Sequence, residues 1–125
     1  MDEKTLLAEA AKAKQHAYAP YSKAKVGACV ETASGEIFCG CNVENASYGL
    51  TICAERVAIF AAVAGGHTRI KQVAIVADGM AKPAPCGACL QVMNEFGVEK
   101  VIIGKPDGSY ETFDLVSLLP HPFRL

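Results

Sequence analysis

The sequence predicts an α/β protein built around one sheet that has helices on both faces. Segments with the 3.6-residue period of helices alternate with short apolar runs that are typical of buried strands. Hydrophobic residues make up 51% of the 125 residues, which is enough for a substantial core. We therefore expect a single domain over residues 1–125.

Charge and hydropathy argue against two classes of partner. The formal net charge is −1, with acidic and basic residues mixed along the chain, whereas polynucleotide-binding proteins usually present a basic face. No apolar run approaches the length of a membrane span. We expect a small substrate that is not strongly anionic, and neither nucleic acid nor a membrane as a partner.

The first half of the chain predicts a helix followed by a hairpin. The apolar residues of segment 2–17 fall largely on one helical stripe, and Pro20 disfavours a longer helix. Segments 26–32 and 37–41 predict strands, and the Ala-Ser-Gly at 33–35 has the chemistry of a turn between them.

The second half predicts alternating helices and strands. A helix that starts near residue 52 is apolar on all sides, so we expect it to be buried between layers. The expected elements, in order, are a helix over 52–64, a central strand over 73–77, a helix over 87–96, a buried strand over 101–103, an edge strand over 110–113 and a last helical turn capped by Asp114.

Two cysteine motifs open the two later helices: Cys53-Ala54-Glu55-Arg56 and Pro85-Cys86-Gly87-Ala88-Cys89. A catalytic zinc keeps three protein ligands and leaves its fourth position to water, whereas a structural zinc has four. Cys53, Cys86 and Cys89 supply three thiolates, and Glu55 supplies a carboxylate that can move protons on and off that water. This layout is the one found in zinc-dependent base deaminases.

The six cysteines allow other interpretations. The Cys-x-x-Cys pair could be a redox pair, or half of a structural zinc site whose fourth thiolate is Cys29, Cys39 or Cys41. A closed site leaves Glu55 without a role and Cys53 without a second half-motif. The ample apolar content and the absence of a signal peptide disfavour a disulfide framework. We expect six reduced thiols in a cytoplasmic protein, with Cys39 and Cys41 as small buried residues.

Residues beside the cysteines are candidates for supporting roles. Three thiolates and one Zn²⁺ sum to a charge of −1, and Arg56 can offset it by donating to two cysteine sulfurs. The alternative for Arg56 is a surface position on its helix. The backbone amide of Ala54 can read the edge of a base. In the loop that starts at residue 42, we interpret Asn42 and Glu44 as ligand contacts; the alternatives are an Asx turn and a solvated carboxylate.

With these residues in place, the chain resembles the small homotetrameric cytidine deaminases with a three-cysteine zinc site, over essentially its full length. The motifs that carry the resemblance are Tyr18-Ala19-Pro20-Tyr21-Ser22, Val26-Gly27-Ala28, Gly40-Cys41-Asn42-Val43-Glu44-Asn45-Ala46 and the two cysteine motifs. The resemblance implies a three-layer α/β/α cytidine deaminase-like fold with a five-stranded mixed sheet. It also implies one Zn²⁺ per subunit and a homotetramer whose active sites are shared between neighbouring subunits.

The resemblance further implies a reaction and a substrate. Zinc-bound hydroxide attacks C4 of cytidine or deoxycytidine, with Glu55 as the proton shuttle, and yields uridine or deoxyuridine for pyrimidine salvage. Asn42 and Glu44 are implied to bind the ribose hydroxyls. Tyr48 and Phe123 are implied to reach the site of a neighbouring subunit.

Two departures from the family pattern bear on the substrate. Ala24 stands where the family commonly has a phenylalanine that packs on the pyrimidine, and Leu90 stands where an arginine usually follows the last cysteine. Loss of an aromatic contact forfeits about 0.5–1.5 kcal/mol beyond area burial. The alternative substrate is therefore a modified cytosine, either an N4-substituted nucleoside or a cytosine-containing antibiotic. Retained Asn42 and Glu44 favour a nucleoside with a free ribose.

A further alternative belongs to another class: a non-catalytic, zinc-stabilised binding protein. Replacement of Glu55 by glutamine separates the two classes, because an enzyme loses turnover while it keeps its zinc, whereas a binding protein loses nothing.

Overall fold

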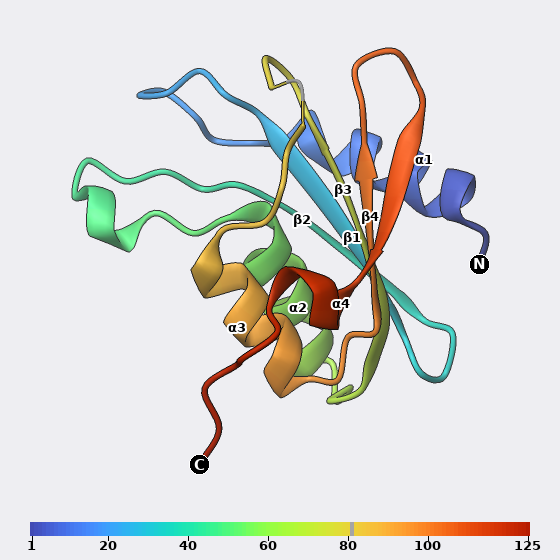
Figure 1. Ribbon diagram of the computed structural model, residues 1–125. Helices are drawn as coiled ribbons and strands as arrows, with labels where there is room; N and C mark the ends of the chain where they lie inside the picture. Colours follow the sequence, from blue (N-terminus) through green and yellow to red (C-terminus); the bar gives the residue numbers. More distant parts are fainter. Residues whose placement is uncertain (81) are drawn as a thin grey trace.

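The computed structural model describes residues 1–80 and 82–125, in which five strands form one sheet in the order β2-β1-β3-β4-β5 (Figure 1). The strands are β1 (Val26–Thr32), β2 (Ile37–Cys41), β3 (Ile70–Ala77), β4 (Lys100–Gly104) and β5 (Tyr110–Asp114). The helices are α1 (Glu3–Lys14), the short 3-10 helix η1 (Tyr48–Leu50), α2 (Ala54–Ala64), α3 (Gly87–Glu95) and α4 (Leu115–Leu118).

The sheet is mixed, as the family resemblance implies. β1 pairs antiparallel with β2 through the predicted hairpin and also with β3, whereas β3 and β4 are parallel because α3 carries the chain back between them. β5 closes the other edge antiparallel to β4. The carboxyl end of β3 therefore opens directly into the loop that leads to the second cysteine motif.

Helices cover both faces of the sheet and complete the three layers (Figure 1). Successive side chains of a strand point to opposite faces of the sheet, so alternate residues pack against different helices. Val73 and Ile75 face the cluster under α2 and α3, whereas Cys29, Ala74 and Ile102 face α1. No helix among the described residues is long and apolar enough to cross a lipid bilayer.

Two glycines allow the helices to approach the sheet closely. A Cβ on Gly27 would lie 2.0 Å from the carbonyl oxygen of Ala10, and one on Gly40 would lie 2.6 Å from the amide nitrogen of Ala58. Both distances are shorter than any tolerated contact, so α1 and α2 can pack here only over glycine. Gly40 thereby sets the position of α2, whose first turn carries the predicted catalytic residues.

Helix α2 lies on one face of the sheet, which corrects the expectation that it is buried between layers. Its inner side is buried through Glu55, Ala58, Ile59 and neighbouring alanines. Its outer side keeps Phe60 45% exposed. Helix α2 therefore has apolar residues on all sides but is buried on only one of them. Helix α1 also ends earlier than predicted, at Lys14 rather than at residue 17, because Gln15 caps it.

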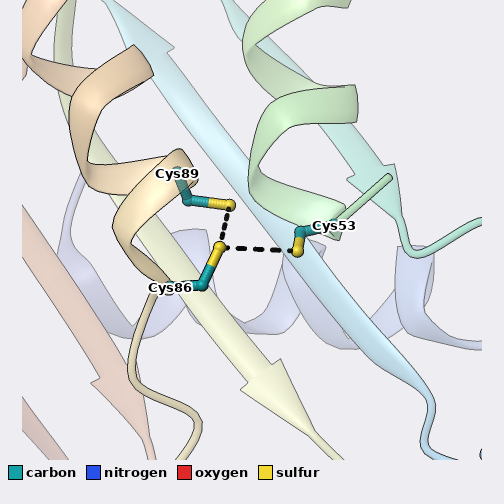
Figure 2. A group of neighbouring side chains, drawn as sticks. All are labelled: Cys53, Cys86 and Cys89. Carbon is teal, nitrogen blue, oxygen red and sulfur yellow. Dashed lines mark hydrogen bonds between the residues drawn. The ribbon is translucent and has the colours of Figure 1, made fainter. Parts of the chain in front are cut away.

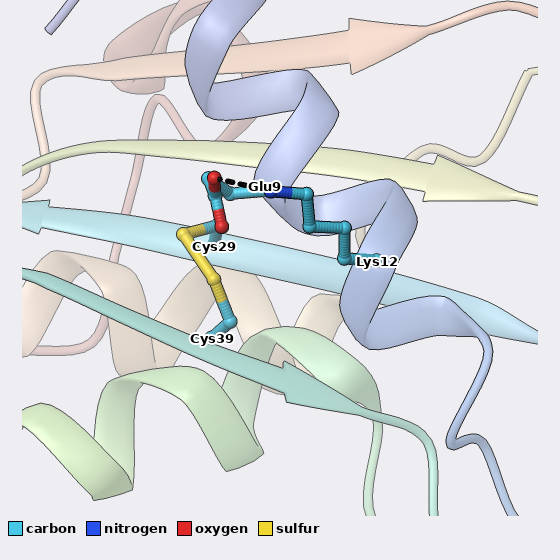
Figure 3. The surroundings of a disulfide bond; sticks show 4 residues. All are labelled: Glu9, Lys12, Cys29 and Cys39. Carbon is cyan, nitrogen blue, oxygen red and sulfur yellow. Dashed lines mark hydrogen bonds and ion pairs between the residues drawn. A yellow bond between two sulfur atoms is a disulfide. The ribbon is translucent and has the colours of Figure 1, made fainter.

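Cys29 and Cys39 form a disulfide between β1 and β2, beneath the part of α1 that carries Glu9 and Lys12 (Figure 3). The expectation of six reduced thiols is therefore wrong for this pair. The hairpin register places the two residues directly opposite one another, with their Cα atoms 4.1 Å apart. Cys39 and Cys41 are also half-buried rather than buried, because β2 is an edge strand.

Candidate active site

The three predicted zinc ligands lie together where α2 and α3 begin (Figure 2). The Sγ atom of Cys86 lies 3.8 Å from that of Cys53 and 3.5 Å from that of Cys89, and all three sulfurs lie within 4.8 Å of one another. A tetrahedral zinc with Zn–S bonds of about 2.3 Å spaces its sulfurs about 3.8 Å apart. The cysteine cluster therefore has the dimensions of a zinc site.

The local backbone explains why the sulfurs converge. Cys53 and Cys86 are the N-cap residues of α2 and α3, both with extended backbone, and Cys89 follows in the first turn of α3. The positive ends of two helix dipoles thus point at the sulfurs, and such a field favours thiolates over thiols. The spacing of the second motif follows from the helix, which brings residues three apart onto one face.

A fourth thiolate does not join this cluster in the part of the chain that the structure describes. There, Cys53, Cys86 and Cys89 are the group of His, Cys, Asp or Glu side chains that could hold a metal ion. Cys29 and Cys39 are bonded to one another and face α1, on the opposite side of the sheet. A three-ligand site with one open position fits a catalytic zinc better than a structural one.

Arg56 approaches the cluster from the first turn of α2, and its Nη2 donates a hydrogen bond to the Sγ of Cys53 over 3.5 Å. Interactions with the Cys89 thiol, then with Arg56 and Cys86, lower the pKa of Cys53 to about 5, against the opposing effect of burial. The pKa of Cys89 is raised, first by its hydrogen bond to Cys53 and then by burial. The hydrogen-bonded pair of Cys53 and Cys89 therefore favours one thiolate even without metal.

Glu55 is buried, with only 5% of its surface exposed, and it lines the same cavity as Cys53 and Cys86. Desolvation, reinforced by the charge of Cys53, raises the pKa of its carboxyl to about 7. A carboxyl with this pKa can both accept and release a proton near neutral pH, as a general acid–base requires.

The cavity beside the cysteine cluster has a volume of about 240 Å³. The predicted site residues that line it are Ala24, Asn42, Cys53, Ala54, Glu55 and Cys86. Further wall residues come from the segment before β1, from the segment between η1 and α2, and from the loop after β3; they include Ser22, Thr51, Met80, Pro83 and Ala84. Elements far apart in the sequence therefore build a single pocket around Glu55.

Asn42 and Glu44 bind the backbone of the segment that precedes β1. Oδ1 of Asn42 accepts from the amide of Val26 over 2.9 Å, and Nδ2 donates to the carbonyl of Ala24 over 2.8 Å. The Glu44 carboxylate accepts from the amides of Tyr21 and Ser22 over 3.0 and 3.1 Å and from the Ser22 hydroxyl. Hydrogen bonding, chiefly from the Ser22 side chain, lowers the pKa of Glu44.

Ser22 is a site residue to which the sequence assigned no role. Its hydroxyl donates to Glu44 and accepts from the amide of Ala24 over 3.0 Å. It lines the cavity beside the cysteines and also a second cavity of about 340 Å³, which it shares with Glu44 and Thr51. The motif around Ser22 was visible in the sequence, but its partner Glu44 could not be recognised from spacing alone.

A known family model covers most of the chain that carries this site. The model of the cytidine and deoxycytidylate deaminase zinc-binding region matches residues 1–105. The chain belongs to the cytidine and deoxycytidylate deaminase family.

Individual relatives agree with this deaminase family over nearly their full lengths. A cytidine deaminase of Sporosarcina psychrophila is 45% identical over 125 residues, which cover 98% of this chain and 92% of the relative. The crystal structure of cytidine deaminase from Burkholderia pseudomallei superposes with a TM-score of 0.93 at 44% identity, and the match covers 98% of this chain and 100% of that one. The crystal structure of cytidine deaminase from Mycobacterium tuberculosis matches with a TM-score of 0.87 at 38% identity, over 100% of this chain and 99% of the other. The predicted family and fold class are therefore confirmed.

The remaining predicted residues of this deaminase-family chain lie outside the first cavity. Tyr48 is 75% exposed and lines the second cavity, where its ring meets that of Tyr21 edge-on with centroids 5.9 Å apart. Phe123 is 70% exposed on the C-terminal tail. The side-chain amide of Gln91 holds that tail, because it accepts from the amide of Phe123 over 3.1 Å and donates to its carbonyl over 3.0 Å. Leu90 packs, half-buried, against the core under α3.

Proposed function

We propose that this protein hydrolytically deaminates cytidine or deoxycytidine, yielding uridine or deoxyuridine and ammonia, as a cytoplasmic enzyme of pyrimidine salvage. The observation that carries the proposal is the buried Glu55 carboxyl, which lines one cavity together with two cysteines of the zinc cluster. Relatives of matching length that are named cytidine deaminases support the choice of substrate.

The chemistry divides between the metal and one carboxyl. A zinc ion held by Cys53, Cys86 and Cys89 supplies the Lewis acidity that makes water a nucleophile at neutral pH. Glu55 takes a proton from that water and delivers it to the ring nitrogen of the base. The same carboxyl would then take the remaining proton of that water from the new hydroxyl on C4 and pass it to the amine, so that the C4–N4 bond breaks, ammonia leaves and a carbonyl remains at C4.

The nucleoside is bound by groups that keep unused hydrogen-bonding capacity. Each polar atom of the Asn42 amide makes one bond in the protein, so each can make another, and the Glu44 carboxylate has about four acceptor positions. We infer that Asn42 and Glu44 accept or donate to the ribose hydroxyls. Ala54 lines the cavity, and we infer that its backbone amide reads the base edge.

A second candidate substrate is favoured by one observation at the cavity wall. Ala24 lines the cavity with only a methyl group, so the wall leaves room that a larger side chain would fill. An N4-substituted cytosine nucleoside, or a cytosine-containing antibiotic, could occupy that room while the same proton shuttle acts on it. We keep this substrate class as the alternative within the same chemistry.

We also propose that the protein is a homotetramer of single-domain subunits in which neighbours complete each active site. The support is the exposure of several large apolar side chains: Leu50 is 64% exposed and Phe60 45%, in addition to Tyr48 and Phe123. Exposed apolar side chains that gather on a surface are typical of protein interfaces. Tyr48 and Phe123 are not among the residues that line the cavity beside Glu55, as expected if they serve a neighbour's site.

The test is ammonia release from cytidine, deoxycytidine and N4-methylcytidine, measured together with zinc content, for the wild type and for Glu55→Gln. We expect turnover of cytidine by the wild type and its loss by at least about a hundredfold in the variant, with zinc retained. Full zinc content with no turnover of any of the three nucleosides by the wild type would instead indicate the non-catalytic binding protein.

A further inference from the structure

One wall of the cavity beside the cysteines is a loop that joins β3 to the second cysteine motif. Of its described residues, Met80, Pro83 and Ala84 line the cavity, and Pro83 is buried. The described residues between β3 and α3 belong to no strand or helix, so the ladders of the sheet do not fix them. The position of the loop must come from contacts that its own residues make.

The start of the loop is attached to the N-terminal part of the chain. The carboxylate of Asp78 lies 2.7 Å from Nζ of Lys14, at the end of α1. The amide of Asp78 also donates to the carbonyl of Lys25 over 2.9 Å. These contacts hold the first residue of the loop against the segment that leads into β1.

The later part of the loop is attached to the opposite edge of the sheet. Nζ of Lys82 lies 3.2 Å from Oε2 of Glu111 and 4.9 Å from the centre of the Phe113 ring. The other oxygen of Glu111 is held by Nζ of Lys105 at 2.5 Å. Glu111 belongs to β5 and pairs with Ile103 of β4, so it is a fixed point on the sheet.

These ion pairs differ from an ordinary surface pair in what they connect. The pair between Glu9 and Lys12 joins two residues of one helix that are already held in place. The pair between Lys82 and Glu111 instead joins an irregular segment to a strand. The free energy of such a pair is small, but here it acts on the position of three residues of the cavity wall.

We propose that Lys82 and Glu111 are positioning residues for substrate binding: their ion pair, with the cation–π contact of Lys82 on Phe113, holds the Met80–Pro83–Ala84 wall in the geometry that the substrate requires. Neither residue lines the cavity, so neither touches the substrate. The inference rests on the proposed deamination but assigns residues that the chemistry itself does not use. Lys105 pairs with Glu111 from β4's C-terminal side, whereas among the described residues it is Lys82 that joins the loop to this carboxylate.

The chain offers a matched control for the test. Lys82→Gln and Glu111→Gln both release the loop, whereas Lys105→Gln removes a second lysine from the same carboxylate and leaves the loop attached. At low ionic strength we expect the first two variants to raise the KM for cytidine about two- to fivefold, as the loss of an exposed ion pair allows. Their kcat and zinc content should stay within about twofold of wild type. Lys105→Gln should change the KM less than Lys82→Gln and Glu111→Gln do. Lys82→Arg keeps a cation at this position, so its KM should be close to that of the wild type.

Salt and hydrogen exchange supply independent readouts. At about 1 M salt the Debye length is only about 3 Å, so the wild-type KM should rise toward that of Glu111→Gln, whose own KM should barely change. Exchange of the backbone amides of residues 82 and 84, which lie on either side of Pro83, should be faster in Lys82→Gln and Glu111→Gln than in Lys105→Gln. An unchanged KM in Lys82→Gln, or an equal effect of Lys105→Gln, would overturn the proposal. A wild type that does not deaminate cytidine would refute the proposed function, while the exchange experiment would still test the attachment of the loop.

Discussion

The guanidinium of Arg56 donates from Nη2 to the Sγ of Cys53 over 3.5 Å, so a cation from the first turn of α2 touches a sulfur of the cysteine cluster. Three thiolates and one Zn²⁺ carry a net charge of −1, which opposes the acidity of a metal-bound water. Arg56 withdraws charge from one sulfur. The family resemblance implies a second arginine at position 90, where this chain has Leu90, so we expect Arg56 to offset the charge without a second cation.

Replacement of Arg56 by alanine should therefore weaken zinc retention or slow turnover by about tenfold, as the loss of a group that binds a metal ligand typically does. The measurement is zinc per subunit after exposure to a chelator, together with the rate of ammonia release. Arg56→Lys keeps the charge but loses the planar donor, and it should fall between the alanine variant and the wild type. Normal metal content and normal turnover in the alanine variant would show that the charge is offset elsewhere.

The disulfide between Cys29 and Cys39 leaves four free thiols, at Cys41, Cys53, Cys86 and Cys89. Protein purified without reductant, unfolded and freed of zinc, should therefore titrate four thiols with a thiol reagent, and six after reduction. Cys29→Ser is the matched control and should titrate five thiols in both states. Six thiols before reduction would mean that the pair is reduced in the isolated protein, as the sequence suggested.

The hairpin shows both the reach and the limit of prediction from this sequence. Alternating residues and a turn tripeptide located β1 and β2 at the residues where the structure has them, because both signals are local. The pairing of Cys29 with Cys39 depends on the register of that hairpin. The apolar content and the absence of a signal peptide predict reduced thiols, but neither of them carries information about the register.

The same contrast holds in the candidate site. Cys53, Cys86 and Cys89 could be grouped in advance, because helix N-termini beside the sheet bring such motifs together. The bonds from Ser22 to Glu44 and from Lys82 to Glu111 have no periodic signature, because each joins two irregular or edge segments across the fold. Only the folded chain shows which polar residues of these segments meet.

Acid should destabilise the protein in part through Glu31. Its carboxylate is 5% exposed and accepts from the N-terminal ammonium of Met1 over 2.8 Å and from Nε2 of Gln72 over 2.6 Å. The ammonium, with help from Gln72, lowers the pKa of Glu31 below its ordinary 4.5. Because the folded-state pKa is the lower one, the stabilisation is complete above about pH 4.5 and is lost as the pH falls through the folded-state pKa.

The check is urea unfolding of the wild type, Glu31→Gln and Glu9→Gln at about pH 7 and about pH 3. Glu31→Gln should lower the free energy of unfolding at neutral pH, and its difference from the wild type should shrink in acid. Glu9→Gln removes an exposed helix pair and should change little at either pH. A difference for Glu31→Gln that is the same at both pH values would show that the carboxylate charge is not what stabilises the fold.

The space beside Ala24 decides between the two candidate substrates. Two hydrogen bonds hold the backbone of Ala24 at the cavity wall: its carbonyl accepts from the side chain of Asn42, and its amide donates to the hydroxyl of Ser22. A phenylalanine at this position would therefore start from the same backbone geometry. Ala24→Phe should lower the KM for cytidine about two- to tenfold, because an aromatic contact with the base contributes about 0.5–1.5 kcal/mol. The same ring should fill the room that an N4-substituent needs, and so reduce turnover of N4-methylcytidine.

Steady-state kinetics with both nucleosides measure the ratio of the two kcat/KM values. If wild type already prefers N4-methylcytidine and Ala24→Phe reverses that preference, Ala24 sets the specificity. If the ratio is the same in both proteins, Ala24 does not set the specificity and another residue supplies the contact to the base.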